Sequence, residues 1–174
     1  MKKNSVYIIA AVDDKFGIGK AGKLPWTLKQ DLQFFQKTTT KTDSVTKANM
    51  VIMGRKTWES IPPERRPLPG RRNVVLTSHA DFKAPGIYVF ESLKDAFEAA
   101  DEFIDSIFVI GGGQVFEEAI RARNLKGIYL THVKGNFKCD TFFPKIPRSF
   151  KPELLEESKE NGLEFKFVFY SASS

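Results

Sequence analysis

Residues 106–121 read SIFVIGGGQVFEEAIR, and they indicate the fold more clearly than any other stretch of the chain. The apolar run Ser106–Ile110 has the composition of a strand that is buried on both faces of a sheet. Three glycines follow, and Gln114–Arg121 continues with a helical pattern. A strand that turns directly into a helix is typical of α/β proteins. Three glycines exceed the needs of a tight turn, so we favour close approach of this backbone to a ligand.

The same alternation continues along the rest of the chain. Strand-like runs lie at Val6–Val12, Met50–Met53, Asn73–Thr77, Ile87–Phe90, Ser106–Ile110, Ile128–Val133, Leu154–Ser158 and Glu164–Tyr170. Helical patterns lie between them at Leu28–Lys37, Arg55–Ser60, Leu93–Asp101 and Gln114–Arg121. This order predicts an α/β fold with a largely parallel sheet, to which a hairpin-like C-terminus adds an antiparallel strand. No repeat or linker divides the 174 residues, so we expect residues 1–174 to form a single domain.

Local signals set the limits of some of these elements. Thr27, followed by Gln30 three positions later, predicts a capping box at the start of the first helix. Ser92 and Asp95 form a similar signature before a later helix. Thr38–Asn49 is the most polar stretch of the chain, and we expect it to be a surface loop.

The composition excludes some classes of protein. The net charge of +6, from 27 basic and 21 acidic residues, fits nucleic acid, a polyanionic cofactor or substrate, or an ordinary basic surface. No apolar run approaches the ~18 residues of a membrane span. Cys139 is the single cysteine and cannot form an internal disulfide, which fits a reducing cytoplasm. One cysteine and two scattered histidines supply no metal-ligand spacing, so no metal is expected.

A carboxylate interrupts the apolar face of the first predicted helix. At ~100° per residue, Asp31 falls on one face with Leu28, Leu32, Phe34 and Phe35. An acid in a first turn is favoured by the helix dipole, but a solvent-facing position would serve the dipole equally well. Burying a carboxylate is costly without a partner, and its two oxygens suit the paired N–H groups of a flat heterocycle. We therefore expect a ligand to meet Asp31, and we expect burial to raise its pKa.

A second glycine-rich segment has a different character. Gly17–Gly22 matches the GxGxxG pattern of dinucleotide-binding proteins, but that motif should open a helix. Here it runs into Lys23-Leu24-Pro25-Trp26, and Pro25 prevents a continuing helix. The segment is better interpreted as a mobile flap that closes over a ligand.

Cations and hydroxyls follow two other predicted strands. Gly54-Arg55-Lys56-Thr57 brings positive charge to a helix start, where it opposes the helix dipole unless a polyphosphate compensates. Thr77 and Ser78 end another strand with hydroxyls that suit a phosphate. Such a cluster alone is often solvated surface, but strand ends form the usual ligand edge of an α/β sheet.

Seven motifs, taken together, resemble the dihydrofolate reductase family from about Val6 to Tyr170. They are Ile18-Gly19, Leu24-Pro25-Trp26, Asp31 five residues after Trp26, Val51 to Trp58 (VIMGRKTW), Pro67 to Arg71 (PLPGR), Ile110 to Gly113 (IGGG) and Asp140 to Pro144 (DTFFP). The resemblance implies an eight-stranded mixed sheet flanked by four helices. It also implies reduction of 7,8-dihydrofolate to tetrahydrofolate with NADPH, which supplies one-carbon metabolism and thymidylate synthesis.

The resemblance also implies site residues. Asp31 would hold the pterin ring with support from Thr131, Arg71 would bind the substrate's glutamate tail, and Trp26 and Leu24 would lie on the flap. The apolar walls of the substrate pocket would be Ile9, Ala11, Leu32, Phe35, Ile61, Leu68 and Ile110. The cofactor-binding residues would be Ala11, Ile18, Gly19, Gly54, Arg55, Lys56, Thr57, Leu76, Thr77, Ser78, Gly112, Gly113, Gln114, Val115 and Phe116. A cis peptide bond is expected between Gly111 and Gly112.

Two positions depart from the family pattern: Phe116 stands where many members have tyrosine, and Gln114 where some have a basic residue. By resemblance we further expect a cytoplasmic monomer that binds antifolates. A pyrimidine reductase of flavin synthesis is an alternative, but it would not need Asp31 and Arg71 as a pair. A nucleic-acid-binding module is a third interpretation, against which the basic residues form no long run and no binding motif.

Overall fold

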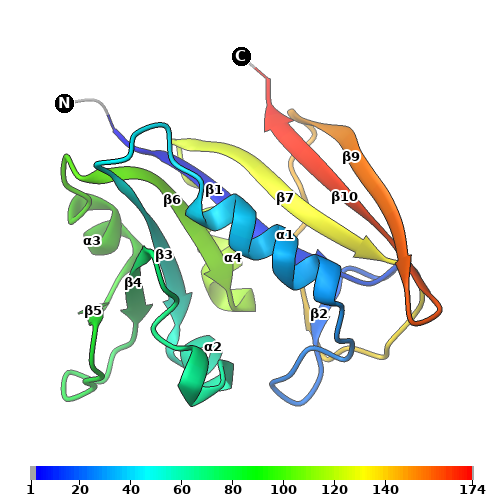
Figure 1. Ribbon diagram of the computed structural model, residues 1–174, viewed down its shortest axis with the longest axis horizontal. Helices are drawn as coiled ribbons and strands as arrows, with labels where there is room; N and C mark the ends of the chain where they lie inside the picture. The colour runs from blue at the N-terminus through cyan, green and yellow to red at the C-terminus, as the bar shows by residue number, and fades with distance from the viewer. Residues whose placement is uncertain (1–2, 174) are drawn as a thin grey trace.

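The computed structural model describes residues 3–173, and an eight-stranded sheet forms its centre (Figure 1). The strands lie in the order β5-β4-β3-β6-β1-β7-β10-β9. In chain order they are β1 (Ser5–Val12), β3 (Ala48–Gly54), β4 (Arg71–Leu76), β5 (Ile87–Phe90), β6 (Ile104–Gly111), β7 (Leu125–Val133), β9 (Phe150–Glu160) and β10 (Leu163–Ala172). The strands from β5 to β7 run parallel, whereas β10 is antiparallel to β7 and β9. The predicted mixed, mostly parallel sheet is confirmed.

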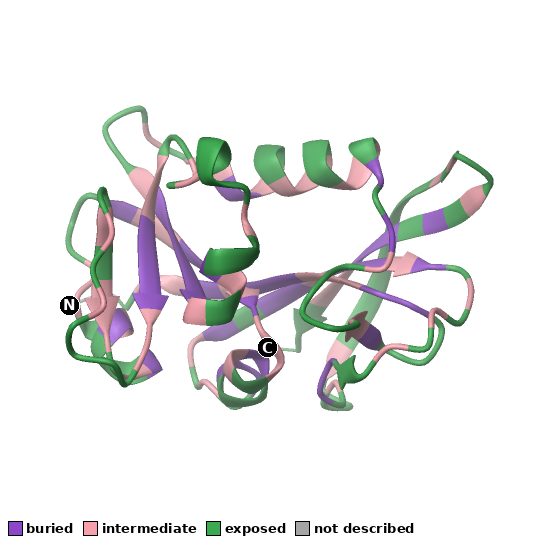
Figure 2. Cartoon of the chain, turned by 90° about the horizontal axis from the view of Figure 1, so that it is seen from below, coloured by how far each residue is buried: buried purple, intermediate pink, exposed green. Residues whose placement is uncertain are grey.

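Four α-helices cover the two faces of this sheet, as the resemblance implied (Figures 1 and 2). They are α1 (Lys29–Thr40), α2 (Arg55–Ser60), α3 (Leu93–Glu98) and α4 (Gly113–Ala119). Side chains of α1 and α2 form one core with Val51 and Val75 of the sheet, and α3 and α4 form another with Val74 and Val109. The central strand β3 is buried at five consecutive positions, as expected of a strand covered on both faces. Within residues 3–173, no helix is long and apolar enough to cross a membrane.

The segment predicted as a long polar loop is shorter and less exposed than expected. Helix α1 continues to Thr40 and β3 begins at Ala48, and the side chains of Thr39 and Asn49 are fully buried. The Asn49 amide donates to the carbonyls of Thr39 and Lys41, at 2.9 and 2.8 Å. The prediction was wrong at these ends because polar residues that satisfy one another's hydrogen bonds can be buried.

The predicted capping box at α1 is also wrong, whereas the Ser92 signature is confirmed. The N-cap of α1 is Leu28, and no side chain of that residue caps the helix. The backbone N–H groups of Lys29 and Gln30 instead donate to the carboxylate of Glu160, at 2.7 and 3.0 Å. Before α3, the hydroxyl of Ser92 accepts from the backbone N–H of Asp95. A long-range contact therefore replaces the local cap at the helix that carries Asp31.

A two-stranded ribbon, β2 (Gly17–Gly19) with β8 (Thr141–Phe142), was not predicted. It holds the base of the expected flap against a distant loop. Its anchor is the buried carboxylate of Asp13, which accepts from the backbone N–H groups of Lys15, Gly17 and Phe137. Burial raises the pKa of Asp13, but these hydrogen bonds outweigh it and leave the pKa below its usual value. The flap thus begins at a fixed, ionised support.

Candidate active site

Asp31 lies in the first turn of α1 and faces the sheet. Its Oδ1 accepts a hydrogen bond of 2.6 Å from the hydroxyl of Thr131, near the C-terminal end of β7. Thr131 is 2% exposed, so this hydroxyl is fixed in the interior. Phe167 pairs with Thr131 in the register of β10 and β7, and it shares an apolar cluster with Trp26 and Leu28. Asp31 is partly exposed, and the Thr131 hydroxyl holds its carboxyl group against the interior.

This environment changes the acidity of Asp31. Burial raises its pKa above the usual value, the hydrogen bond from Thr131 lowers it, and the negative charge of Glu160 raises it again. The net direction is upward, because removal of water disfavours the charged form. A carboxyl group with a raised pKa keeps its proton to a higher pH than usual and can exchange it with a bound molecule.

Trp26 and Leu24 occupy the segment between β2 and α1. Trp26 is buried against Phe137, and its indole Nε1 makes no hydrogen bond to any described residue. A buried donor of this kind is a group that a bound polar molecule can satisfy. Leu24 is 51% exposed, which suits a flap residue that contacts a ligand only when one is present.

Most of the expected apolar wall residues lie together. Ile9, Phe35, Ile61, Leu68 and Ile110 belong to one cluster, in which Ile9 is buried and the others are partly exposed. Ala11 belongs to the neighbouring cluster that contains Trp26. Leu32 lies outside both clusters with 46% of its surface exposed, one residue beyond Asp31 on α1. These partly exposed apolar side chains offer surface for a flat ring.

Arg71 begins β4 and is held in a defined orientation. Its Nε donates to the carbonyl of Pro69 at 3.0 Å, and its Nη1 donates to the hydroxyl of Thr39 at 3.0 Å. The guanidinium also lies over the ring of Phe35, 6.0 Å from its centre. Burial lowers the pKa of Arg71, but an arginine stays charged near neutral pH. An oriented guanidinium beside an apolar wall suits the carboxylate of an otherwise apolar ligand.

The glycines after β6 form a close-packed backbone surface. An ideal Cβ on Gly113 would lie 2.9 Å from Cγ2 of Thr141, and one on Gly112 would lie 3.4 Å from Oγ1 of Thr57. A Cβ on Gly54, at the end of β3, would lie 3.5 Å from Cγ2 of Val115. Of these three positions, Gly113 is the one where a Cβ would be crowded, whereas the distances at Gly112 and Gly54 are those of ordinary contacts. The peptide bond between Gly111 and Gly112 is cis, as expected.

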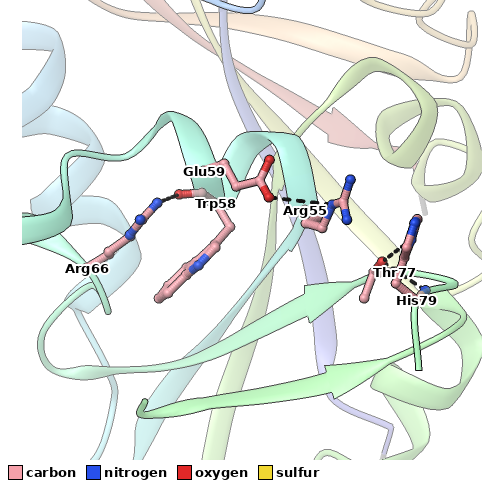
Figure 3. A network of polar contacts seen from close by, with 6 residues as sticks. All are labelled: Arg55, Trp58, Glu59, Arg66, Thr77 and His79. Atoms are coloured by element: carbon pink, nitrogen blue, oxygen red, sulfur yellow. Dashed lines mark hydrogen bonds and ion pairs between the residues drawn. The ribbon is translucent and has the colours of Figure 1, made fainter. Parts of the chain in front are cut away.

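Cations and hydroxyls lie at the same sheet edge. Gly54 pairs with Leu76 in the parallel register of β3 and β4, so Arg55 and Thr77 follow neighbouring strand ends. Figure 3 shows Arg55 paired with Glu59, at 3.6 Å, and Thr77 bonded to the backbone N–H of His79, at 3.1 Å. The edge therefore carries a guanidinium, a hydroxyl and an imidazole that suit phosphate oxygens.

The remaining expected cofactor residues divide into three groups. Lys56, Ser78 and Gln114 are exposed. Ile18 and Gly19 lie on β2, and the Ile18 side chain is 3.8 Å from where a Cβ on Gly113 would lie. Leu76 and Phe116 pack in the core, Phe116 against Phe143, so their side chains support the edge from beneath.

Sequence reasoning missed His79 and Glu160 as neighbours of these sites. His79 follows the Thr77-Ser78 pair by one position, so continuing that motif would have found it. Glu160 contacts α1 from 130 residues away in sequence, and no local pattern signals that contact. Arg66 supports α2 instead of the site: its guanidinium donates to the carbonyl of Trp58 at 2.8 Å and lies over the Trp58 ring (Figure 3).

These features define an α/β protein in which a carboxyl group lies beside an apolar wall and in which cations, hydroxyls and glycines follow the strand ends. The sequence matches the family model described as "Dihydrofolate reductase" over residues 5–172. The chain therefore belongs to the dihydrofolate reductase family.

Individual relatives agree with this assignment. A dihydrofolate reductase from Drosophila melanogaster is 39% identical over 171 residues, covering 92% of this chain and 93% of that protein. The structure of Schistosoma mansoni dihydrofolate reductase matches with a TM-score of 0.86 and 36% identity, over 99% of this chain and 100% of that one. A bifunctional dihydrofolate reductase-thymidylate synthase from Glycine max is 44% identical over 173 residues, covering 94% of this chain and 32% of that protein. The chain thus spans about a third of such bifunctional relatives.

Proposed function

We propose that this chain reduces 7,8-dihydrofolate to 5,6,7,8-tetrahydrofolate, with NADPH as the hydride donor. The observation that carries the proposal is the Asp31 carboxyl group, held by Thr131 at 2.6 Å in a family member matched over residues 5–172. The product would serve one-carbon metabolism and thymidylate synthesis.

The residues at the strand ends fit NADPH. Gly112 and Gly113 carry no side chains beside their backbone amides, which would leave room for a pyrophosphate there. Arg55, Thr57 and Thr77, with Lys56 and Ser78 beside them, would hold the adenosine 2′-phosphate, which favours NADPH over NADH. Bound NADPH supplies the hydride that reduces the pterin at C6.

The protein's own part is to bind, orient and protonate. Asp31 would accept hydrogen bonds from the 2-amino group and the adjacent ring N–H of the pterin, and would favour addition of a proton at N5. Thr131 fixes the orientation of Asp31, and Arg71 would bind the glutamate tail at the other end of the substrate. Trp26 and Leu24, on the flap, would help to exclude water. The overall change adds one hydride and one proton to dihydrofolate.

An absorbance assay tests this function. NADPH oxidation should require dihydrofolate and should not occur with the aminopyrimidine substrate of flavin synthesis. Turnover of the pyrimidine, with none of dihydrofolate, would instead support the alternative reductase.

We also propose a cytoplasmic monomer that binds antifolates and has no nucleic-acid partner. The single cysteine supports the reducing compartment, and the dispersed basic residues argue against a nucleic-acid surface. Cell fractionation, sedimentation of the purified chain, antifolate inhibition of NADPH oxidation and salt-dependent DNA or RNA titrations test these four statements.

A further inference from the structure

The first turn of α1 is capped by a distant carboxylate. Glu160 Oε2 accepts from the backbone N–H of Lys29 at 2.7 Å, and its Oε1 accepts from that of Gln30 at 3.0 Å. The two N–H donors belong to residues one and two positions before Asp31. The Glu160 carboxylate therefore satisfies two of the N–H groups that a helix start leaves without partners.

Glu160 is held firmly enough to fix this turn. It is the last residue of β9, and it pairs with Leu163 of β10 across the two-residue turn Asn161-Gly162. Both turn residues have positive φ, 51° and 78°, as a tight hairpin turn requires. Ser158, two residues earlier on β9, also donates its hydroxyl to the side chain of Gln30. Three hydrogen bonds, two from backbone N–H groups to Glu160 and one from Ser158, thus join the tip of the hairpin to the start of α1.

The structure assigns to Glu160 the role of a positioning residue for Asp31: its carboxylate caps the turn that carries Asp31 and places a negative charge beside it. This inference rests on the proposed function, because it concerns the carboxyl group assigned to that reaction. Glu160 bonds to the backbone N–H groups of Lys29 and Gln30, so it acts through the turn that carries Asp31.

The charges around Asp31 give this role a direction. On β7, Thr131 faces Asp31, whereas His132 points to the other face, where it contacts Tyr170 and feels the charges of Lys166 and Asp14. Among the described residues, Glu160 is the charged group that acts on Asp31, and its charge raises the pKa of Asp31. An uncapped helix start would instead stabilise the Asp31 carboxylate through its dipole. Both effects of Glu160 favour the protonated carboxyl group.

The test compares Glu160→Gln with wild type, and Glu153→Gln serves as the matched control. Gln keeps the length and one acceptor oxygen but removes the charge, and Glu153 is an exposed carboxylate on the same strand. The first readout is ¹³C-NMR titration of the Asp31 carboxyl group in the free protein, assigned with Asp31→Asn. The second is the pH dependence of single-turnover reduction.

We expect the E160Q titration midpoint of Asp31 to fall by about half to one pH unit, which lowers the rate above that midpoint by roughly 3- to 10-fold. The rate well below the midpoint should stay within about twofold, and E153Q should match wild type. An unshifted midpoint with a uniform rate loss at every pH would overturn the inference, because it would show a purely structural cap. Glu160→Ala, which removes the charge together with the cap, should shift the midpoint in the same direction if E160Q folds poorly. If the wild type does not reduce dihydrofolate, the proposed function fails while the NMR titration still decides the role of Glu160.

Discussion

The two ends of the proposed site use opposite physical means. At one end, the protein holds the partly buried carboxyl group of Asp31 against the interior by a hydrogen bond from Thr131. At the ends of β3, β4 and β6, it leaves backbone amides bare and sets Arg55 and Thr77 in partly exposed positions. Surroundings of low polarity change the pKa of a carboxyl group strongly. An exposed cation, in contrast, contributes little to the binding of an anion, so several cations must act together.

This difference predicts that the Asp31 end of the site controls the chemical step, whereas the strand-end residues control the affinity for the cofactor. Changes near Asp31 should alter the rate of the chemical step and its pH dependence. Changes at the strand ends should alter the KM for the cofactor and leave the chemical step nearly intact. The following substitutions test that division.

The largest effect should come from Asp31→Asn. The amide cannot exchange a proton, so turnover at pH 7 should fall by about 100-fold or more, within the range of a lost general acid. Steady-state and single-turnover assays measure this loss, and a change in the KM for NADPH of more than about threefold would break the division of roles.

The same variant should be at least as stable as wild type at neutral pH. Burial raises the pKa of Asp31 in the folded state, so the folded protein binds the extra proton and loses stability as pH rises through the window between the unfolded and folded values. The amide side chain in D31N does not titrate, so this variant does not lose this stability at pH values above the folded-state pKa of Asp31. Urea unfolding at pH 7 measures it, and clear destabilisation would show that the carboxylate has a structural role.

Next in size should be Arg71→Leu. Loss of a charged pair with the glutamate tail should raise the KM for dihydrofolate by about 10- to 100-fold, since hydrogen bonds to charged groups contribute ~1.5–3 kcal/mol. A dihydropterin without the glutamate tail is the control substrate, and its KM should not change. Equal losses for both substrates would place Arg71 outside tail binding.

A smaller effect is expected for Arg55→Ala at the other end. The KM of this variant for NADPH should rise by roughly fivefold, because a partly exposed ionic contact contributes ~1 kcal/mol. Its KM for NADH, which lacks the 2′-phosphate, should change less. The matched variant is Arg121→Ala, which removes an arginine that follows α4 and has the same kind of i,i+4 glutamate partner. Identical losses with NADPH and NADH would rule out 2′-phosphate binding by Arg55.

The smallest change should follow Thr131→Val. The hydroxyl of Thr131 lowers the pKa of Asp31, so its removal should raise that pKa and move the pH profile of reduction upward. One hydrogen bond contributes ~1 kcal/mol, so the shift should change the rate at pH 7.5 by no more than about fivefold. A downward shift would mean that Thr131 does not donate to Asp31 in solution.

The sequence predicted the eight main strands and four helices because their patterns are local: apolar runs such as Ser106–Ile110 and the helical period around Asp31. It also predicted that Asp31 would face the interior. It missed the β2–β8 ribbon, whose strands are three and two residues long and carry too few side chains for a pattern. It missed the Glu160 cap because that contact depends on how a hairpin folds back over a distant helix, which only the tertiary structure determines.

The pH dependence of single-turnover hydride transfer in wild type and D31N tests the account most directly. In the wild type, the rate should be highest below the raised pKa of Asp31 and should fall as pH increases through it. In D31N, the rate should be low and should lack that titration. A D31N profile that falls with pH in the same way as the wild-type profile would contradict the assignment of this carboxyl group to the reaction.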